Sequence, residues 1–412
     1  MKTLIKSATI INSGSKHHGL VRDIYIDRGK IIQIGKNLSV DKATIINIPQ
    51  TFVSSGWIDL RANFREPGHE YKENLESGAK AAKRGGFSKV VLMPSTTPTV
   101  NYKSQVDFII NRSKSLSVKL LPAGALTQGM KSEQLSEMFD MYSAGAVAFT
   151  DDKLAVGTEL MTRALDYTSN FGGCVMSFPM DFGIILGGMM HEGPTSTSMG
   201  VKGIPSAAEE ISLQRDIELL RYTNGRLHVS LISTTKSVDI IRKAKKEGLN
   251  ITCAIAAHQL YFTDEDLKTF DSNFKVLPPY RSKEDRKSLI NGLKDGTIDA
   301  ICSDHCPEDI EHKVREFQDA EFGISSIETT FCSAFTALEK YLTLEEIVNK
   351  LNAGPAKVLG ISSSKIEEGN EADLTVFTIS QNTTFDRQSW QSRSYNSPFI
   401  GKELRGRIIP VD

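Results

Sequence analysis

Polar and charged side chains follow several short apolar runs of the 412-residue chain. The first such run, 56–62, brings Arg61 and Asn63 to its end. Two later runs end in Thr150-Asp151-Asp152 and Ser303-Asp304-His305. A carboxylate can accept a proton or ligate a metal, and a guanidinium is a permanent cation that pairs with carboxylates. These residue types predict a polar site that combines aspartates with a fixed positive charge.

The middle of the chain, 53–362, alternates short apolar runs with longer amphipathic ones. Amphipathic patterns such as 74–84 and 206–222 predict helices between the strands. The strand candidates are 56–62, 88–95, 119–126, 146–151, 174–179, 226–233, 250–257 and 300–305. Eight strand–helix repeats over roughly 300 residues predict an α/β fold, a closed (β/α)₈ TIM barrel whose strand ends share one mouth. A doubly wound sheet is the alternative, but no Gly-x-Gly-x-x-Gly follows the first strand.

Both ends of the chain have the alternation typical of strands. In the N-terminal part, Asp27-Arg28-Gly29-Lys30 predicts a hairpin turn, and Ala372 to Phe377 predicts a strand in the C-terminal part. Neither end holds enough strands for a sheet of good size. We therefore expect 1–52 and 363–412 to pair into one small β-domain that flanks the barrel.

Composition excludes several classes of protein. The net charge is −1 with 24% charged residues, which does not point to nucleic acid or an anionic membrane as a partner. The five cysteines are scattered and odd in number, so reduced thiols are expected rather than disulfides. No run approaches the length of a membrane span, and the first residues lack the apolar core of a signal peptide. A cytoplasmic protein is the expectation.

Several motifs in consistent order resemble those of the dihydroorotases, cyclic amidohydrolases of the amidohydrolase superfamily. They include Phe64-Arg65-Glu66-Pro67-Gly68, Gly187 to Gly193, Pro278-Pro279-Tyr280-Arg281, Ser303 to Pro307 and Asn352 to Ala356. The resemblance implies an α/β barrel with a flanking β-domain. It also implies the reversible cyclisation of carbamoyl-aspartate to dihydroorotate in pyrimidine biosynthesis.

The resemblance further implies a zinc centre, with histidines after strands 1, 5 and 6 and carboxylates after strands 4 and 8. The aspartate after strand 8 also serves as the general base. In this sequence the histidine positions hold Arg61, Asn63, Phe178 and Leu231. Of the family's ligands only Asp151 and Asp304 are left, as vestigial ligand positions, with Asp304 also at the vestigial base position.

Zn²⁺ needs three or four nitrogen, sulfur or oxygen ligands, which these side chains do not provide. Arg61 adds a cation whose repulsion, at about 4 Å and an effective dielectric of about 20, costs about 4 kcal/mol per unit charge. We therefore expect no zinc, no other cofactor and no turnover. We also expect the Arg61 guanidinium to replace the metal charge by pairing with Asp304 or Asp151.

The substrate-binding positions implied by the resemblance are only partly kept. Arg65, which clamps the substrate carboxylate in the family, is present, and the strand-2 asparagine is replaced by Ser95. Leu277 and Glu308 occupy two other recognition positions. An acidic Glu308 is expected to repel an anionic substrate.

Three function classes follow, in order of preference. The first is a non-catalytic dihydroorotase-like protein that acts as a scaffolding partner of aspartate carbamoyltransferase. The resemblance implies this partner, because relatives that have lost their metal ligands assemble with that enzyme. A homo-oligomer is also expected. The second is an active dihydroorotase with a rearranged zinc site, with His258 or His305 as new ligands. The third is a metal-independent enzyme or small-carboxylate binder built on Arg65, Asp151 and Asp304.

Overall fold

A computed structural model describes residues 2–411. Its central feature is an eight-stranded sheet whose paired neighbours all run parallel. The strands in sheet order are β15 (Ala300–Cys302), β14 (Ile251–Ala256), β13 (Leu227–Val229), β10 (Val175–Ser177), β9 (Ala148–Phe149), β8 (Lys119–Gly124), β7 (Phe87–Leu92) and β6 (Trp57–Ala62). The first and last strands meet where the Asn63 amide donates to the His305 carbonyl at 2.8 Å. The predicted (β/α)₈ barrel is confirmed.

Most strands are shorter than predicted. β9 covers two residues of the predicted 146–151, and β15 covers three of 300–305. Beyond these strands Asp152 and Asp304 have positive φ angles of 55° and 50°. Such left-handed backbone is uncommon for residues other than glycine and often marks functional positions.

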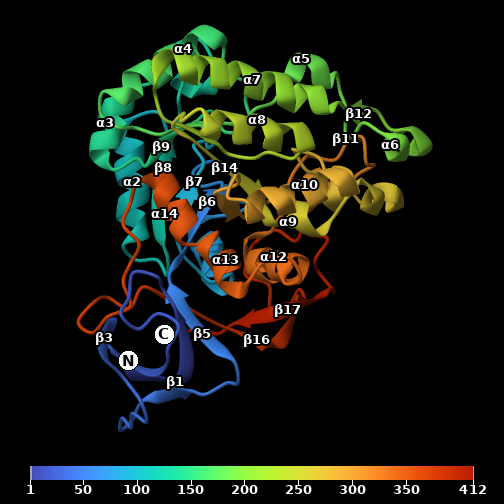
Figure 1. The fold of residues 1–412 in the computed structure, drawn as a ribbon. Coiled ribbons are helices and arrows are strands. Elements are labelled where there is room, and N and C mark those ends of the chain that lie inside the picture. Colours follow the sequence, from blue (N-terminus) through green and yellow to red (C-terminus); the bar gives the residue numbers. More distant parts are fainter. Residues whose placement is uncertain (1, 412) are drawn as a thin grey trace.

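Helices surround the barrel (Figure 1). The longer ones are α1 (Leu75–Arg84), α2 (Lys103–Ser113), α4 (Thr158–Ser169), α7 (Ser206–Thr223), α8 (Thr235–Lys246), α10 (Lys283–Lys294) and α12 (Thr330–Leu338). Shorter ones are α3 (Met138–Ala144), α5 (Phe182–Ile185), α6 (Pro194–Met199), α9 (Ala257–Tyr261), α11 (Ile310–Lys313), α13 (Leu344–Asn349) and α14 (Ala353–Leu359). The 3₁₀ helices are η1 (Gln128–Met130), η2 (Asp264–Thr269), η3 (Ser272–Phe274) and η4 (Ile327–Thr329). No helix within residues 2–411 is long and apolar enough to cross a membrane.

A second sheet joins the two ends of the chain, as predicted. It contains β1 (Lys2–Ile11), β2 (Val21–Asp27), β3 (Lys30–Gly35), β4 (Thr44–Ile46), β5 (Thr51–Ser55), β16 (Leu374–Thr384) and β17 (Glu403–Ile408). β16 pairs antiparallel with β5, which leads directly into the barrel strand β6. Figure 1 shows both ends of the chain in this sheet, below the barrel. A separate short ribbon pairs β11 (Met190–His191) with β12 (Gly203–Ile204).

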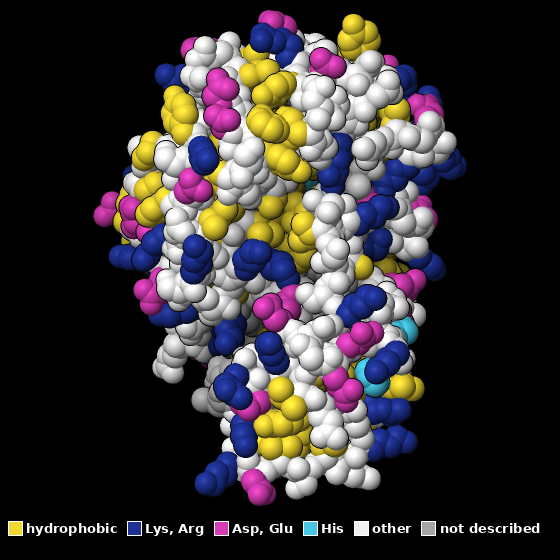
Figure 2. Space-filling view, turned by 90° about the vertical axis from the view of Figure 1, so that its left-hand side faces the viewer, with side chains coloured by type: hydrophobic (Ala, Val, Ile, Leu, Met, Phe, Trp, Pro, Cys, Tyr) yellow, Lys and Arg dark blue, Asp and Glu magenta, His cyan; other side chains and the backbone are white. Residues whose placement is uncertain are grey.

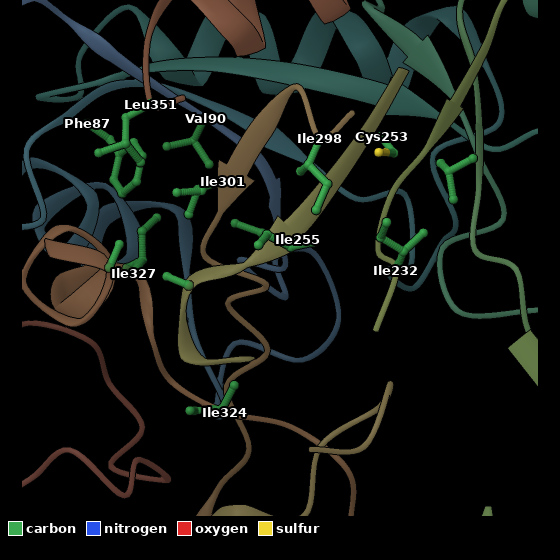
Figure 3. Packing of buried hydrophobic residues seen from close by; sticks show 14 of the residues in the cluster. Phe87, Val90, Ile232, Cys253, Ile255, Ile298, Ile301, Ile324, Ile327 and Leu351 are labelled. Atoms are coloured by element: carbon green, nitrogen blue, oxygen red, sulfur yellow. The ribbon is translucent and has the colours of Figure 1, made fainter. Parts of the chain in front are cut away.

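The barrel strands are buried on both faces, which explains their nearly continuous apolar sequences. Alternate residues contribute to two cores. In β14, Ala254 and Ala256 belong to one cluster, and Cys253 and Ile255 belong to another. Figure 3 shows part of the second cluster, where Val90, Ile255 and other strand residues pack with residues of the surrounding chain. All five cysteines are buried and free, as expected.

The surface carries both signs of charge. Figure 2 shows basic and acidic side chains interspersed over one face, together with exposed apolar side chains. This mixture agrees with the net charge of −1.

Gly78 gives a test of the packing beside the barrel mouth. A Cβ atom at this position of α1 would lie 2.5 Å from Cγ of Phe64, whose ring is buried and packs against His305. We expect Gly78→Ala to lower the free energy of unfolding by about 1–3 kcal/mol, because the ring has no room to move. The matched control is Gly14→Ala in a turn, where the added Cβ would make only ordinary contacts at 3.8 Å. Denaturant unfolding measures both, and an unchanged stability of Gly78→Ala would contradict the packing described.

Candidate active site at the barrel mouth

Arg61 and Asp304 form a buried ion pair at the mouth of the barrel. Arg61 lies near the end of β6, and Asp304 lies two residues beyond β15. The guanidinium Nε donates to Asp304 Oδ1 at 2.9 Å, and both side chains are 1% exposed. The predicted pairing of Arg61 with Asp304 is confirmed.

The second carboxylate on this guanidinium is that of Asp152. Arg61 Nη2 donates to Asp152 Oδ1, and Asn63 Nδ2 donates to Asp152 Oδ2 at 2.9 Å. The Ser95 hydroxyl also donates to Asp152 Oδ2 and accepts from Asn63 at 2.7 Å. Burial acts to raise the pKa of Asp152, but Arg61 and these donors hold it below its usual value. Asp152 is therefore an anion at neutral pH.

Asp151 does not lie at this centre, although the sequence analysis assigned it there. Its Oδ1 accepts from the amides of Leu126 and Thr127, both at 2.9 Å, and its Oδ2 accepts from the Thr127 hydroxyl. Burial raises its pKa. Asp151 thus fastens the chain after β8 to the end of β9, and its neighbour Asp152 contacts Arg61.

Lys153 supplies a second cation that the sequence analysis missed. Its Nζ lies 3.0 Å from Asp304 Oδ2. Phe178, immediately after β10, has its ring centroid 5.6 Å from Arg61 Cζ and 6.0 Å from Lys153 Nζ. Both distances suit cation–π attraction. The centre therefore balances two cations against the carboxylates of Asp152 and Asp304.

One of the two candidate histidines faces this centre. His258, in α9 directly after β14, has its Nε2 3.9 Å from Asp304 Oδ2. Neither ring nitrogen has a hydrogen-bond partner within the protein, and burial lowers the pKa of His258 to about 4. It is therefore a neutral imidazole at pH 7. His305 instead accepts from the Ser326 amide through Nδ1, with its Nε2 3.4 Å from Glu73.

Arg65 lies in a separate charged cluster, where it pairs with Glu308. Its Nη2 donates to Glu308 Oε1, and Lys72 Nζ donates to the other carboxylate oxygen of Glu308. Arg65 Nε also donates to the Pro307 carbonyl at 3.2 Å. Glu308 is 5% exposed, so this ion pair is largely shielded from water. The cation expected to clamp a substrate carboxylate already holds a carboxylate of the protein.

The zinc implied by the resemblance does not fit the residues at the family's ligand positions. Of the two aspartates at ligand positions, Asp304 accepts from Arg61 and Asp151 accepts from Leu126 and Thr127. Phe178 and Leu231 carry no ligand atom. Asn63 is committed to Asp152 and Ser95. Within residues 2–411, no group of three or more histidine, cysteine, aspartate or glutamate side chains is placed to hold a metal ion.

The chain is similar in sequence to known proteins. A family model described as dihydro-orotase-like matches residues 51–237. A curated dihydroorotase from Acetivibrio thermocellus is 41% identical over 409 residues, which cover 98% of this chain and 96% of the relative. One from Geobacter metallireducens is 40% identical over 410 residues, with the same coverage.

Solved structures show the same fold. An L-hydantoinase (dihydropyrimidinase) from Arthrobacter aurescens matches with a TM-score of 0.81 at 24% identity, covering 98% of this chain and 93% of the other. A D-hydantoinase matches with a TM-score of 0.82 at 20% identity, covering 99% and 93%. At this identity the likeness supports the barrel and its flanking sheet alone.

The curated relatives overturn two predictions. A non-catalytic scaffolding protein is the wrong conclusion, because relatives that match almost the whole chain at 36–41% identity are named as the enzyme dihydroorotase. The prediction that no cofactor is expected is wrong for the same reason, because the relatives are named as dihydroorotases, for which the resemblance implies zinc. Identity of about 40% over nearly the full length of both chains is decisive for kinship. The chain belongs to the dihydroorotase family of the amidohydrolase superfamily.

Proposed function

We propose that this protein is an active dihydroorotase with a rearranged site. It would open the cyclic amide of dihydroorotate to carbamoyl-aspartate and catalyse the reverse cyclisation, a step of pyrimidine biosynthesis. The observation that supports the proposal most directly is the position of Asp304, held between Arg61 and Lys153 with the His258 ring 3.9 Å away. This constellation stands at the ends of the barrel strands, where enzymes of this fold carry their catalytic groups.

Hydrolysis of a cyclic amide requires a base for water, positive charge for the carbonyl oxygen and a proton for the leaving nitrogen. In the proposed reaction Asp304 accepts a proton from water as the water oxygen bonds to the carbonyl carbon. The carbon–nitrogen bond then breaks, and the same proton passes to the nitrogen. Cyclisation follows the reverse course and releases water.

Arg61 and Lys153 would stabilise the negative charge that develops on the carbonyl oxygen. Arg61 is fixed by Asp152 and Asp304, so its charge needs no reorganisation during the reaction. Lys153 is the more accessible of the two, with a side chain 17% exposed against 1% for Arg61. His258, neutral at pH 7 and with its Nε2 3.9 Å from Asp304 Oδ2, would relay the proton between Asp304 and the substrate nitrogen.

The metal content must be measured together with activity. The resemblance implies that zinc acts as a Lewis acid in this family. In this chain, however, the side chains at the family's ligand positions cannot ligate zinc. Turnover should therefore be followed in both directions, for protein purified without added metal and for protein supplied with zinc. The zinc bound per chain is determined on the same samples.

Wild-type protein is expected to turn over dihydroorotate, and Asp304→Asn is expected to lower kcat by about 10²–10⁴-fold, the usual contribution of a general base. The matched control is Asp239→Asn, which removes an exposed carboxylate paired with Arg242 on α8. Absence of wild-type turnover under every metal condition would refute the proposed function. Wild-type turnover with a fully active Asp304→Asn would refute only the assignment of the base.

Glu308 is expected to compete with the substrate carboxylate for Arg65. Glu308→Gln keeps the shape of the side chain but removes its charge, which leaves Arg65 free to pair with the substrate. We expect KM for dihydroorotate to fall about five-fold, equivalent to about 1 kcal/mol, with little change in kcat. Glu316→Gln, an exposed position in the same segment, is the control. An unchanged or increased KM for Glu308→Gln would show that Arg65 does not meet the substrate.

Association with aspartate carbamoyltransferase and assembly into a homo-oligomer, both expected from the sequence, stay predictions. Neither is needed for the proposed reaction, because every side chain assigned a role comes from one chain.

A further inference from the structure

The chain from Glu308 to Gly323 leaves the barrel mouth and returns to it. Just outside its two ends, the Cys306 amide donates to the Ile324 carbonyl at 2.8 Å. Apart from the short helix α11, residues 308–323 take irregular conformations. They therefore form a compact loop whose ends meet, and loops of this length often act as lids over a functional site.

The loop turns a cationic side chain inward and apolar side chains outward. Lys313, in α11, is 2% exposed, whereas Ile310 and Val314 are 73% and 74% exposed. The buried apolar side chains of the loop are those of Phe317 and Ala320. A segment that buries so little apolar surface opens more easily than the core does.

Two buried amines hold the loop closed. Lys313 Nζ donates to three backbone carbonyls at 2.8–3.0 Å, those of Lys275, Glu321 and Gly323. Lys275 lies outside the loop, and its own Nζ donates to two carbonyls of the loop, each at 2.9 Å. Burial lowers the pKa of both amines, to about 7 for Lys313. Because these partners are neutral carbonyls, an amine that moves into water recovers hydration that closure of the loop costs.

Gly323 connects these bonds to the active site. Its carbonyl accepts from Lys313, and its backbone packs against Glu308. A Cβ atom at Gly323 would lie 3.1 Å from Glu308 Cγ and 2.6 Å from the Cys306 carbonyl oxygen. Glu308 in turn accepts from Arg65 Nη2. Opening the loop therefore removes the packing that positions Glu308 on Arg65.

We propose that residues 308–323 form an autoinhibitory lid. In the closed state the lid holds Glu308 on Arg65, the cation expected to bind the substrate carboxylate. In the open state it carries Glu308 away from Arg65 and releases Lys313 to water. The identity of the ligand rests on the proposed function, whereas the link between the lid and the Glu308–Arg65 ion pair rests on the contacts alone.

Hydrogen exchange of the full chain, followed by mass spectrometry on peptides from 308–323, measures opening. Lys313→Ala removes three hydrogen bonds and should speed exchange of these peptides at least ten-fold. Glu308→Gln should speed it at least three-fold, because coupling between the lid and the ion pair is reciprocal. The control is Arg315→Ala, which removes an exposed cation of the same loop whose bond goes to the Glu311 carbonyl in α11. Its peptides should exchange as in wild type, and peptides from the barrel strands should be unchanged in every variant.

Isothermal titration calorimetry with carbamoyl-aspartate measures access to Arg65 on the same proteins. Lys313→Ala should bind it about three-fold more tightly than wild type, because Arg65 is free of Glu308 in a larger fraction of molecules. Arg315→Ala should bind it as wild type does.

Three results would each overturn the lid. They are unchanged exchange of 308–323 in Lys313→Ala, unchanged exchange in Glu308→Gln, and a Lys313→Ala variant that binds carbamoyl-aspartate no more tightly than wild type. Neither measurement depends on turnover. An inactive protein that gives the expected exchange and binding would refute the proposed function alone, and an active protein that does not give them would refute the lid alone.

Discussion

The bond of Arg61 to Asp304 and Asp152 is the interaction on which the barrel mouth depends. It crosses the seam at which the parallel sheet closes, because Arg61 belongs to β6 and Asp304 follows β15. At that seam the backbone contributes the Asn63–His305 hydrogen bond, and the Asp59 carboxylate accepts from the Ser303 amide at 2.8 Å. Two carboxylates brought together in this buried place would repel each other without a cation between them. The guanidinium thus stabilises the closure and the positions of the site residues at once.

The same bond determines what the site can offer a substrate. Arg61 and Lys153 balance Asp152 and Asp304, so the centre is close to neutral before any ligand binds. Beside it, the one carboxylate of Glu308 pairs with two cations, Arg65 and Lys72. In the proposed reaction, a carboxylated substrate would replace Glu308 on Arg65, and recognition would be an exchange of ion pairs. The curated relatives place the chain among dihydroorotases. The proposed exchange would distinguish its substrate recognition from the family pattern that the resemblance implies.

The fold could be predicted from the sequence because each barrel strand is buried on both faces and appears as a short apolar run. The site could be predicted only in part. The pairing of Arg61 with Asp304 follows from charge and strand position, but the choice between Asp151 and Asp152 does not. The two are adjacent, and the positive φ of Asp152 decides which carboxylate reaches Arg61. Lys153 was missed because a lysine after a strand is usually solvated. The missing zinc ligands predicted a non-catalytic protein. The identity of about 40% to dihydroorotases overturns that prediction.

A double-mutant cycle between Arg61 and Asp304 tests the central interaction most directly. The free energy of unfolding is measured for wild type, Arg61→Gln, Asp304→Asn and the double variant. Each single change should cost about 3–5 kcal/mol, because it leaves a buried charge without its partner. The double variant should cost at least about 2 kcal/mol less than the sum of the two. Effects that add to within about 0.5 kcal/mol would show that the two side chains do not hold the mouth together.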